Sequence, residues 1–185
     1  MTRITAGLYR GRRLQTPAGE TTRPTSERVR EALGNALVAA GGLNGARVLD
    51  LYAGTGALGL ELISRGADSL VSVEQDRAAL VALRANVATL QVPDAVVVGA
   101  DVKSWAGSPG GRRFDFVVAD PPYDLPTSEL GTIFAALAAN GHLNPDADLI
   151  VERSRRSGEM QWPDPLVGVR TKNYGDTRLC YGRAP

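Results

Sequence analysis

Short apolar runs alternate with longer amphipathic stretches between Arg47 and Val151. The runs are rich in Val, Leu and Ile and predict five buried strands, at residues 48–51, 69–74, 95–98, 114–119 and 147–151. Between them, apolar residues recur at helical spacing and predict helices over 57–63, from a cap at Asp76 to about Leu90, and from a cap at Thr127 to Gly141. Strands and helices that alternate in this way form right-handed βαβ units, so we expect a parallel sheet.

The pattern changes after Val151. Residues 167–171 and 178–181 read as two short strands, and the segment Lys172–Thr177 between them has no room for a crossover helix. The two strands must therefore form an antiparallel hairpin. Together with the five parallel strands, they predict a Rossmann-like α/β fold with a seven-stranded, mostly parallel sheet.

The N-terminal segment differs from the rest of the chain. Residues 3–8 and 12–16 can pair around Tyr9–Gly11 as a small basic β-hairpin, and a helix over 26–40 then leads into the sheet. We therefore divide the chain into a hairpin extension, residues 1–24, and a single α/β domain, residues 25–185.

The composition narrows the classes of protein. A chain of 185 residues buries roughly 70% of its unfolded surface and needs no disulfide or structural metal. It has one cysteine, Cys180, and one histidine, His142, so we expect neither a disulfide framework nor a His/Cys metal site. No apolar run reaches the roughly 18–20 residues of a membrane span, and the N-terminus lacks a secretory signal. We expect a soluble, cytoplasmic protein without a metal.

The net charge of +1 hides an uneven distribution. Residues 1–44 carry seven arginines and three glutamates, residues 45–150 carry seven basic and thirteen acidic groups, and residues 151–185 carry seven basic and four acidic groups. Basic ends around an acidic middle suit a polyanion that is held at the ends while chemistry happens in the centre. A protein that simply uses arginine in place of lysine would look similar, and composition alone does not decide between the two.

A glycine-rich segment follows the first strand of the sheet and opens a helix. It reads Asp50-Leu51-Tyr52-Ala53-Gly54-Thr55-Gly56-Ala57-Leu58-Gly59. Glycines let the backbone pass close to a bound ligand, which is either a dinucleotide or S-adenosylmethionine. The candidate cofactor-binding residues here are Asp50, Ala53, Gly54, Thr55 and Gly56.

The carboxylate of Asp50 favours S-adenosylmethionine. It would repel the pyrophosphate of a dinucleotide and attract the cationic amino group of the methyl donor. Glu74 ends the second strand and can accept hydrogen bonds from both ribose hydroxyls of either ligand. Asp101 and Val102 follow the third strand and are candidate adenine contacts, although Asp101 can instead cap a short helix.

The fourth strand ends in Asp120-Pro121-Pro122-Tyr123. Ligands of open α/β sheets bind beyond the carboxyl ends of the strands, so this tetrapeptide should face the glycine-rich segment. The exocyclic amine of a base is a poor nucleophile because its lone pair is delocalised into the ring. Asp120 and the Pro121 carbonyl can accept its two N–H bonds, Pro122 helps to fix the loop, and the base can stack on Tyr123, worth roughly 1–3 kcal/mol. These four residues are the candidate catalytic group.

The two motifs together resemble those of the amino-methyltransferases, which act on adenine N6, cytosine N4, guanine N2 or a glutamine amide. The glycine-rich segment precedes Asp120–Tyr123, as in the group that includes the ribosomal RNA guanine-N2 methyltransferases. The alternatives are an adenine-N6 methyltransferase of DNA or RNA, a glutamine-amide methyltransferase, a nicotinamide-dependent reductase that uses the same glycines, and a non-catalytic RNA-binding module.

The resemblance becomes close at the N-terminus. Residues 23–33 read Arg-Pro-Thr-Ser-Glu-Arg-Val-Arg-Glu-Ala-Leu, and Ile4-Thr5-Ala6-Gly7 and Arg10-Gly11-Arg12 precede them. With the two motifs, this sequence resembles the RsmD family of ribosomal small-subunit methyltransferases nearly end to end. The resemblance implies a class I methyltransferase fold, S-adenosylmethionine as methyl donor, and methylation of one guanine N2 in 16S rRNA on an assembled or nearly assembled small subunit.

Basic residues near the N-terminus are the candidate RNA contacts. They would hold phosphates and position the target loop, whose base must leave its stack to reach Asp120. They are Arg10, Arg12, Arg13, Arg23, Arg28 and Arg30. We expect a monomer whose partner is 16S rRNA within the small ribosomal subunit.

Overall fold

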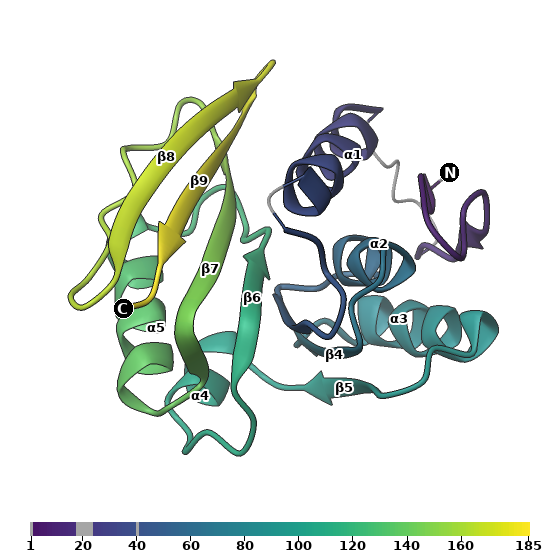
Figure 1. The fold of residues 1–185 in the computed structure, drawn as a ribbon, viewed down its shortest axis with the longest axis horizontal. Coiled ribbons are helices and arrows are strands. Elements are labelled where there is room, and N and C mark those ends of the chain that lie inside the picture. The colour runs from purple at the N-terminus through teal and green to yellow at the C-terminus, as the bar shows by residue number, and fades with distance from the viewer. Residues whose placement is uncertain (1, 18–23, 40) are drawn as a thin grey trace.

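The computed structural model describes residues 2–17, 24–39 and 41–185. Arg23, one of the predicted RNA contacts, lies outside these residues. A seven-stranded sheet runs through the molecule with helices on both of its faces (Figure 1). Its strands are β3 (Arg47–Leu51), β4 (Ser69–Glu74), β5 (Ala95–Gly99), β6 (Phe114–Ala119), β7 (Leu143–Ser154), β8 (Val167–Tyr174) and β9 (Thr177–Arg183).

The strand order is β5-β4-β3-β6-β7-β9-β8. Strands β3 to β7 pair in parallel, and β9 is antiparallel to both β7 and β8. This confirms the predicted Rossmann-like fold with its C-terminal hairpin. The chain builds outward from β3 to β5 and then returns to place β6 on the other side of β3, so the strand order reverses between β3 and β6. A ligand crevice is expected at the carboxyl ends of these two strands.

Two hydrophobic clusters bury the two faces of the sheet. Helices α1 (Pro24–Ala39), α2 (Ala57–Ser64) and α3 (Arg77–Leu90) cover one face, where Leu33 and Leu60 pack with Val118. Helices α4 (Val102–Ala106) and α5 (Thr127–Ala139) cover the other, where Phe134 packs with Leu49. Because both faces are covered, the central parallel strands are nearly continuous apolar runs.

The helix caps agree in part with the sequence. Asp76 accepts a hydrogen bond from the Ala79 backbone N–H at 2.8 Å and starts α3 as predicted. The predicted cap at Thr127 is wrong, because Thr127 is the first residue of α5 and the capping position belongs to Pro126, which makes no side-chain cap hydrogen bond.

The C-terminal hairpin is longer than the sequence predicted. Strands β8 and β9 pair up to Tyr174 and Thr177, which leaves only Gly175 and Asp176 as the turn. The predicted loop over Lys172–Thr177 is therefore wrong at its ends. Strand β8 lies at the edge of the sheet with nearly all of its side chains exposed, so no apolar pattern marks its last residues.

The N-terminal hairpin exists, but its strands β1 (Thr2–Arg3) and β2 (Arg13–Leu14) are only two residues long. Ile4 and Leu14 are buried in the same cluster as α1 and α2. The hairpin is thus packed into the hydrophobic core of the main domain.

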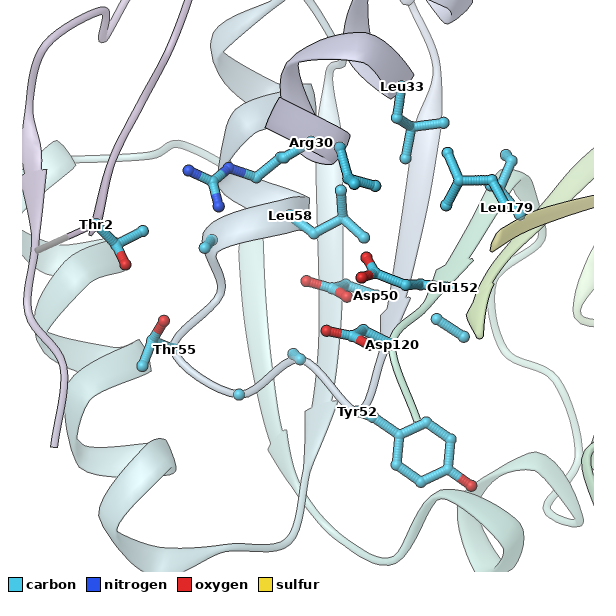
Figure 2. A pocket seen from close by; sticks show the side chains of 16 residues that line it. Thr2, Arg30, Leu33, Asp50, Tyr52, Thr55, Leu58, Asp120, Glu152 and Leu179 are labelled. Carbon is cyan, nitrogen blue, oxygen red and sulfur yellow. The ribbon is translucent and has the colours of Figure 1, made fainter. Parts of the chain in front are cut away.

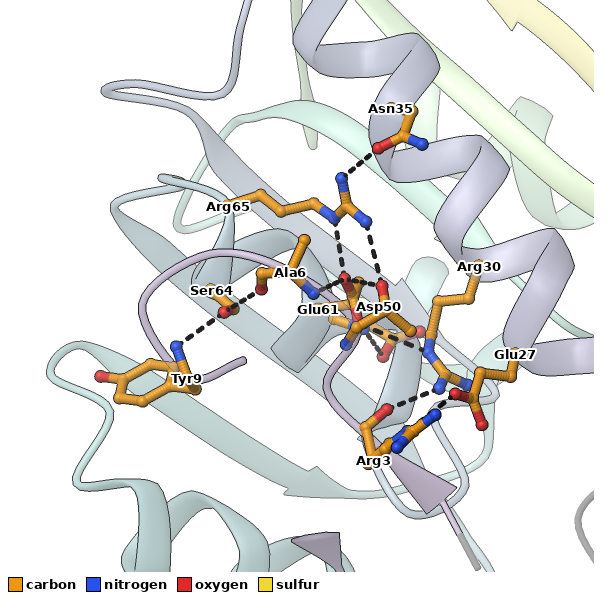
Figure 3. Close-up of polar contacts among 12 residues, drawn as sticks. Arg3, Ala6, Tyr9, Glu27, Arg30, Asn35, Asp50, Glu61, Ser64 and Arg65 are labelled. Carbon is orange, nitrogen blue, oxygen red and sulfur yellow. Dashed lines mark hydrogen bonds and ion pairs between the residues drawn. The ribbon is translucent and has the colours of Figure 1, made fainter. Parts of the chain in front are cut away.

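One buried carboxylate joins the hairpin to two helices (Figure 3). Glu61 of α2 is fully buried and accepts hydrogen bonds from the backbone N–H groups of Thr5 and Ala6 at 2.8 and 3.1 Å. The Nε atom of Arg65, the C-cap residue of α2, lies 2.8 Å from this carboxylate, and the Nε atom of Arg30 in α1 lies 3.7 Å from it. Glu61 therefore fixes how the hairpin and α1 sit beside the carboxyl edge of the sheet.

Candidate active site

A cavity of about 210 Å³ opens where the strand order reverses (Figure 2). Three carboxylate residues line it: Asp50 of β3, Asp120 directly after β6, and Glu152 of β7. The backbone of the glycine-rich segment forms part of the wall. Helices α1 and α2 and strands β7 and β9 supply an apolar part with Val29, Leu33, Leu58, Ile150 and Leu179. The structure thus brings Asp120 to the glycine-rich segment, as the position of both motifs after strands predicted.

The glycine-rich segment turns sharply between β3 and α2. Tyr52, Gly54 and Gly56 have φ angles of 57, 55 and 81°, the left-handed region that side chains other than glycine adopt at a cost. A Cβ atom on Gly54 would meet no atom within 4 Å, which leaves its backbone open to a ligand. A Cβ on Gly59 would lie 2.7 Å from the Asp50 carboxylate, so Gly59 lets α2 approach Asp50 closely.

Asp50 lies at the base of this turn and is 1% exposed. Its Oδ2 accepts a hydrogen bond from the Gly59 backbone N–H at 3.0 Å. Burial raises the pKa of Asp50 to about 7, and the negative charges of Asp120 and Glu74 act in the same direction, while the Gly59 hydrogen bond opposes them. A cationic ligand group at this position would restore the charged carboxylate, which fits the amino group of the methyl donor.

Glu74 supports the same segment from the end of β4. Its Oε2 accepts a hydrogen bond from Gly54 N–H at 2.7 Å, and its Oε1 accepts from Gln75 and Asp76 N–H groups, each at 2.7 Å. A carboxylate has about four acceptor positions, so Glu74 can hold the loop and still accept from ribose hydroxyls. The residues around the turn therefore fit S-adenosylmethionine.

The predicted adenine contacts lie beyond the cavity. Asp101 is exposed and caps α4 by accepting a hydrogen bond from Ser104 N–H at 2.8 Å, and Val102 is buried below it. The capping role of Asp101 is thus confirmed, and the adenine contact stays a prediction.

Arg153 of β7 binds the backbone of the loop that carries the candidate catalytic group. The Arg153 guanidinium is 5% exposed and donates hydrogen bonds to the Leu125 carbonyl at 2.7 Å and to the Pro122 carbonyl at 3.5 Å. Pro121 is buried, whereas Tyr123 is 51% exposed. Arg153 therefore fixes the loop through its carbonyl groups.

Four residues of the site had no sequence motif to mark them: Glu61, Asn86, Glu152 and Arg153. Asn86 of α3 is buried and donates hydrogen bonds to the Thr55 carbonyl at 2.9 Å and to the Gln15 carbonyl at 3.1 Å. It thereby joins the glycine-rich segment to the N-terminal hairpin. A buried polar residue in an otherwise apolar helix face was the signal available for Asn86.

The predicted RNA contacts divide into two groups. Arg10, Arg12, Arg13 and Arg28 are exposed. Arg30 is 5% exposed, lines the cavity, pairs with Glu61 and donates a hydrogen bond to the Arg3 carbonyl at 2.9 Å. Burial lowers the pKa of Arg30, and Glu61 opposes that effect. The structure therefore places Arg30 inside the protein at the wall of the cavity, and its contact with RNA stays a prediction.

Two absences apply to the described part of the chain. Residues 2–17, 24–39 and 41–185 contain no cluster of three or more His, Cys, Asp or Glu side chains that could hold a metal ion. No helix within these ranges is long and apolar enough to cross a membrane.

The fold and the donor site define a class I methyltransferase that uses S-adenosylmethionine. The family described as "Conserved hypothetical protein 95" matches residues 2–183. The chain is 38% identical over 156 residues to "Ribosomal RNA small subunit methyltransferase D" of Escherichia coli K12, which covers 84% of this chain and 76% of the relative. The chain therefore belongs to this family, the RsmD family, as the sequence resemblance indicated.

Further relatives and solved structures are similar to this chain over nearly its whole length. "Putative rRNA methyltransferase YlbH" of Bacillus subtilis is 30% identical over 181 residues, 96% of each chain. The solved structure of "Putative methyltransferase yhhF" from E. coli superposes with a TM-score of 0.86 at 33% identity and covers 99% of this chain and 97% of that one. A 16S rRNA N2 G1207 methyltransferase of T. thermophilus, at 24% identity and a TM-score of 0.70, shares the fold over 91% of this chain and 45% of its own.

Proposed function

We propose that this protein transfers a methyl group from S-adenosylmethionine to the exocyclic N2 amine of one guanine in 16S rRNA, within the small ribosomal subunit. One observation carries the proposal: Asp120 lines the same cavity as Asp50 and Gly54. The group that would accept hydrogen bonds from an amine thus lies beside the groups that would hold the donor. Family membership and the rRNA methyltransferases among the relatives support an rRNA substrate.

The chain's own residues would divide the work of donor binding. Asp50 would attract the donor's amino group, the open backbone at Gly54 would lie against the ligand, and Glu74 would accept hydrogen bonds from ribose hydroxyls. When bound, the donor supplies a sulfonium-activated methyl group.

Asp120 would orient the target amine for attack in line with the bond that breaks. By accepting an N–H hydrogen bond, Asp120 would localise the lone pair on N2 and direct it at the methyl group. Arg153 would keep the rest of the loop in place. The new N–C bond forms as the methyl carbon–sulfur bond breaks, and N2 then loses one proton to water. The methylated amine loses its proton readily, so no strong base is needed. Orientation of the amine would therefore be the main contribution of these residues to the rate.

The RNA would be held by the exposed arginines of the N-terminal hairpin and of α1, namely Arg10, Arg12, Arg13 and Arg28. Arg30 is left out of this group because it is buried. We further propose that the protein acts as a monomer in the cytoplasm, where its ribosomal substrate is found.

The test is transfer of labelled methyl groups to small subunits from cells that lack this protein, followed by nucleoside analysis. We expect N2-methylguanosine at a single position of 16S rRNA. Label on adenine N6 or on a glutamine amide would overturn the substrate and leave the donor site intact. No transfer to subunits, precursor particles or naked rRNA would overturn the proposal as a whole.

A further inference from the structure

Glu152 occupies a position beside Asp120 that the two motifs do not account for. Ala119 of β6 pairs with Val151 of β7 in the parallel register, so the next residues, Asp120 and Glu152, lie at the same level on neighbouring strands. Alternation along each strand turns both side chains toward the face that is covered by α1. Figure 2 shows their carboxylates beside that of Asp50 in the cavity that all three line.

The order of the strands places Glu152 on the far side of Asp120 from the donor. Along the carboxyl edge of the sheet come Glu74 on β4, Asp50 on β3, Asp120 after β6 and Glu152 on β7. Since the donor occupies the part over β4 and β3, the base that presents its amine to Asp120 must enter over β6 and β7. Glu152 would then contact the part of the base that lies next to the amine.

The surroundings of Glu152 favour substrate groups that can donate a hydrogen bond to its carboxylate. Its neighbours in the cavity include the apolar side chains of Leu33, Ile150 and Leu179, and Leu179 is its partner across the β7–β9 pair. Arg30 lines the same cavity, and its positive charge favours the ionised form of this carboxylate. The carboxylate is partly buried, so bulk water solvates it incompletely. A polar group of the substrate that fails to match it would be left unpaired in this environment, which costs binding free energy.

We propose that Glu152 selects guanine by accepting a hydrogen bond from its N1–H group while Asp120 accepts from the N2 amine. The inference rests on the proposed function and names a specificity-determining residue for it. In guanine the ring nitrogen next to the amine carries a hydrogen, whereas the corresponding ring nitrogens of adenine and cytosine carry lone pairs. An ionised carboxylate can only accept hydrogen bonds, so it attracts the first base and repels the other two.

The test replaces the methylated guanine by 2,6-diaminopurine in small subunits reconstituted with ligated 16S rRNA. This base keeps the amine at C2 but has a lone pair at N1. We expect the wild-type protein to prefer guanine by at least about 100-fold in kcat/KM. Glu152→Gln can donate an amide N–H to N1, so the preference should fall by at least tenfold, through both a lower rate on guanine and a higher rate on 2,6-diaminopurine.

The controls separate this role from a structural one. Glu159→Gln removes an exposed carboxylate of the same type and should leave the preference unchanged. If Glu152→Gln lowers the rates on both bases equally, or leaves both unchanged, Glu152 does not read the base and the inference is wrong. If the wild-type protein forms no N2-methylguanosine on unmodified subunits, the proposed function itself fails, and the inference with it.

Discussion

The donor half of the cavity, at β3 and β4, and the acceptor half, at β6 and β7, are shaped by different kinds of contact. On β3 and β4, the oxygens of Asp50 and Glu74 accept hydrogen bonds from backbone N–H groups of Gly59, Gly54, Gln75 and Asp76. On β6 and β7, Arg153 donates hydrogen bonds to the carbonyls of Pro122 and Leu125 and so fixes the backbone of the loop that follows Asp120. Asp120 is exposed and lines the cavity.

The difference follows from what each half must bind. The donor is the same molecule in every turnover, so its site gains from carboxylates that are fixed by backbone hydrogen bonds. The base arrives as part of a large RNA and has to enter the cavity, so its site gains from a loop whose backbone is fixed from the side away from the substrate. Changes in the acceptor half should therefore affect the rate, and changes in the donor half should affect donor binding.

Asp120→Ala should separate the rate of methyl transfer from donor affinity most clearly. We expect methyl transfer to fall by about 10³-fold, because the amine loses the group that orients it. The dissociation constant for S-adenosylmethionine, measured by calorimetry, should change by less than about twofold. Equal losses of binding and rate would mean that the two halves are not separate.

Arg153→Met tests whether the loop needs the hydrogen bonds that Arg153 donates to its backbone carbonyls. Loss of the hydrogen bonds to Leu125 and Pro122 should displace the loop and lower kcat by about 10²-fold, since small displacements at a reacting centre are costly. Donor affinity should stay near the wild-type value. Arg155→Met is the matched control, because Arg155 directly follows β7, is exposed, and its side chain makes a 3.4 Å contact to the Gly175 carbonyl. A full rate in Arg153→Met would show that the loop holds its own shape.

The pH dependence of donor binding tests the buried carboxylate of Asp50. Its pKa is raised to about 7, so below pH 7 the free protein carries a proton there that a cationic ligand group must displace. We expect donor affinity to be about tenfold weaker at pH 6 than at pH 8. Asp50→Asn should remove this dependence, and an equally steep dependence in that variant would assign the titration to another group.

The same group affects the stability of the unliganded protein. Its folded-state pKa lies above the unfolded value, so its contribution is complete below about pH 4 and is lost as the pH rises through 7. Between pH 5 and 8, thermal unfolding should therefore show the Asp50→Asn variant gaining stability relative to the wild type.

The sequence predicted those parts of the fold that depend on local patterns. The five parallel strands, the Asp76 cap and the two loops at the carboxyl edge all follow from short-range periodicity or from residue types with one structural use. The contacts of Glu61 and Arg153 could not be predicted, because each joins segments far apart in the chain. Glu61 binds Thr5, and Arg153 binds Leu125.

The burial of Arg30 was not predicted, although its pattern was present in the sequence. It lies three and seven residues before Leu33 and Leu37, which puts it on the apolar stripe of α1. An arginine on such a stripe is buried only where a carboxylate meets it, and Glu61 supplies that carboxylate from α2. Without knowledge of how α1 packs on α2, the sequence did not show that this arginine is buried.

The smallest expected effect concerns how the RNA reaches the acceptor half. Replacing Arg10, Arg12 and Arg13 together by alanine should weaken binding to the small subunit and make its dependence on salt less steep. Each phosphate contact on a single strand contributes about 0.7 to the slope of log K against log salt concentration, so the slope should fall by up to about 2. Donor binding should not change, because the three side chains are exposed and do not line the cavity.

A matched variant separates the effect of where the arginines lie from the effect of the net charge that they contribute. Arg84, Arg112 and Arg113 are also exposed, and Arg112 and Arg113 precede β6 at the amino end of that strand, away from the cavity. Their replacement by alanine removes the same charge, so long-range attraction falls equally, but direct phosphate contacts should be kept and the slope should stay close to the wild-type value. If both triple variants lower the slope equally, the N-terminal hairpin has no special place in RNA binding. The exposed arginines would then act only through the net charge of the protein.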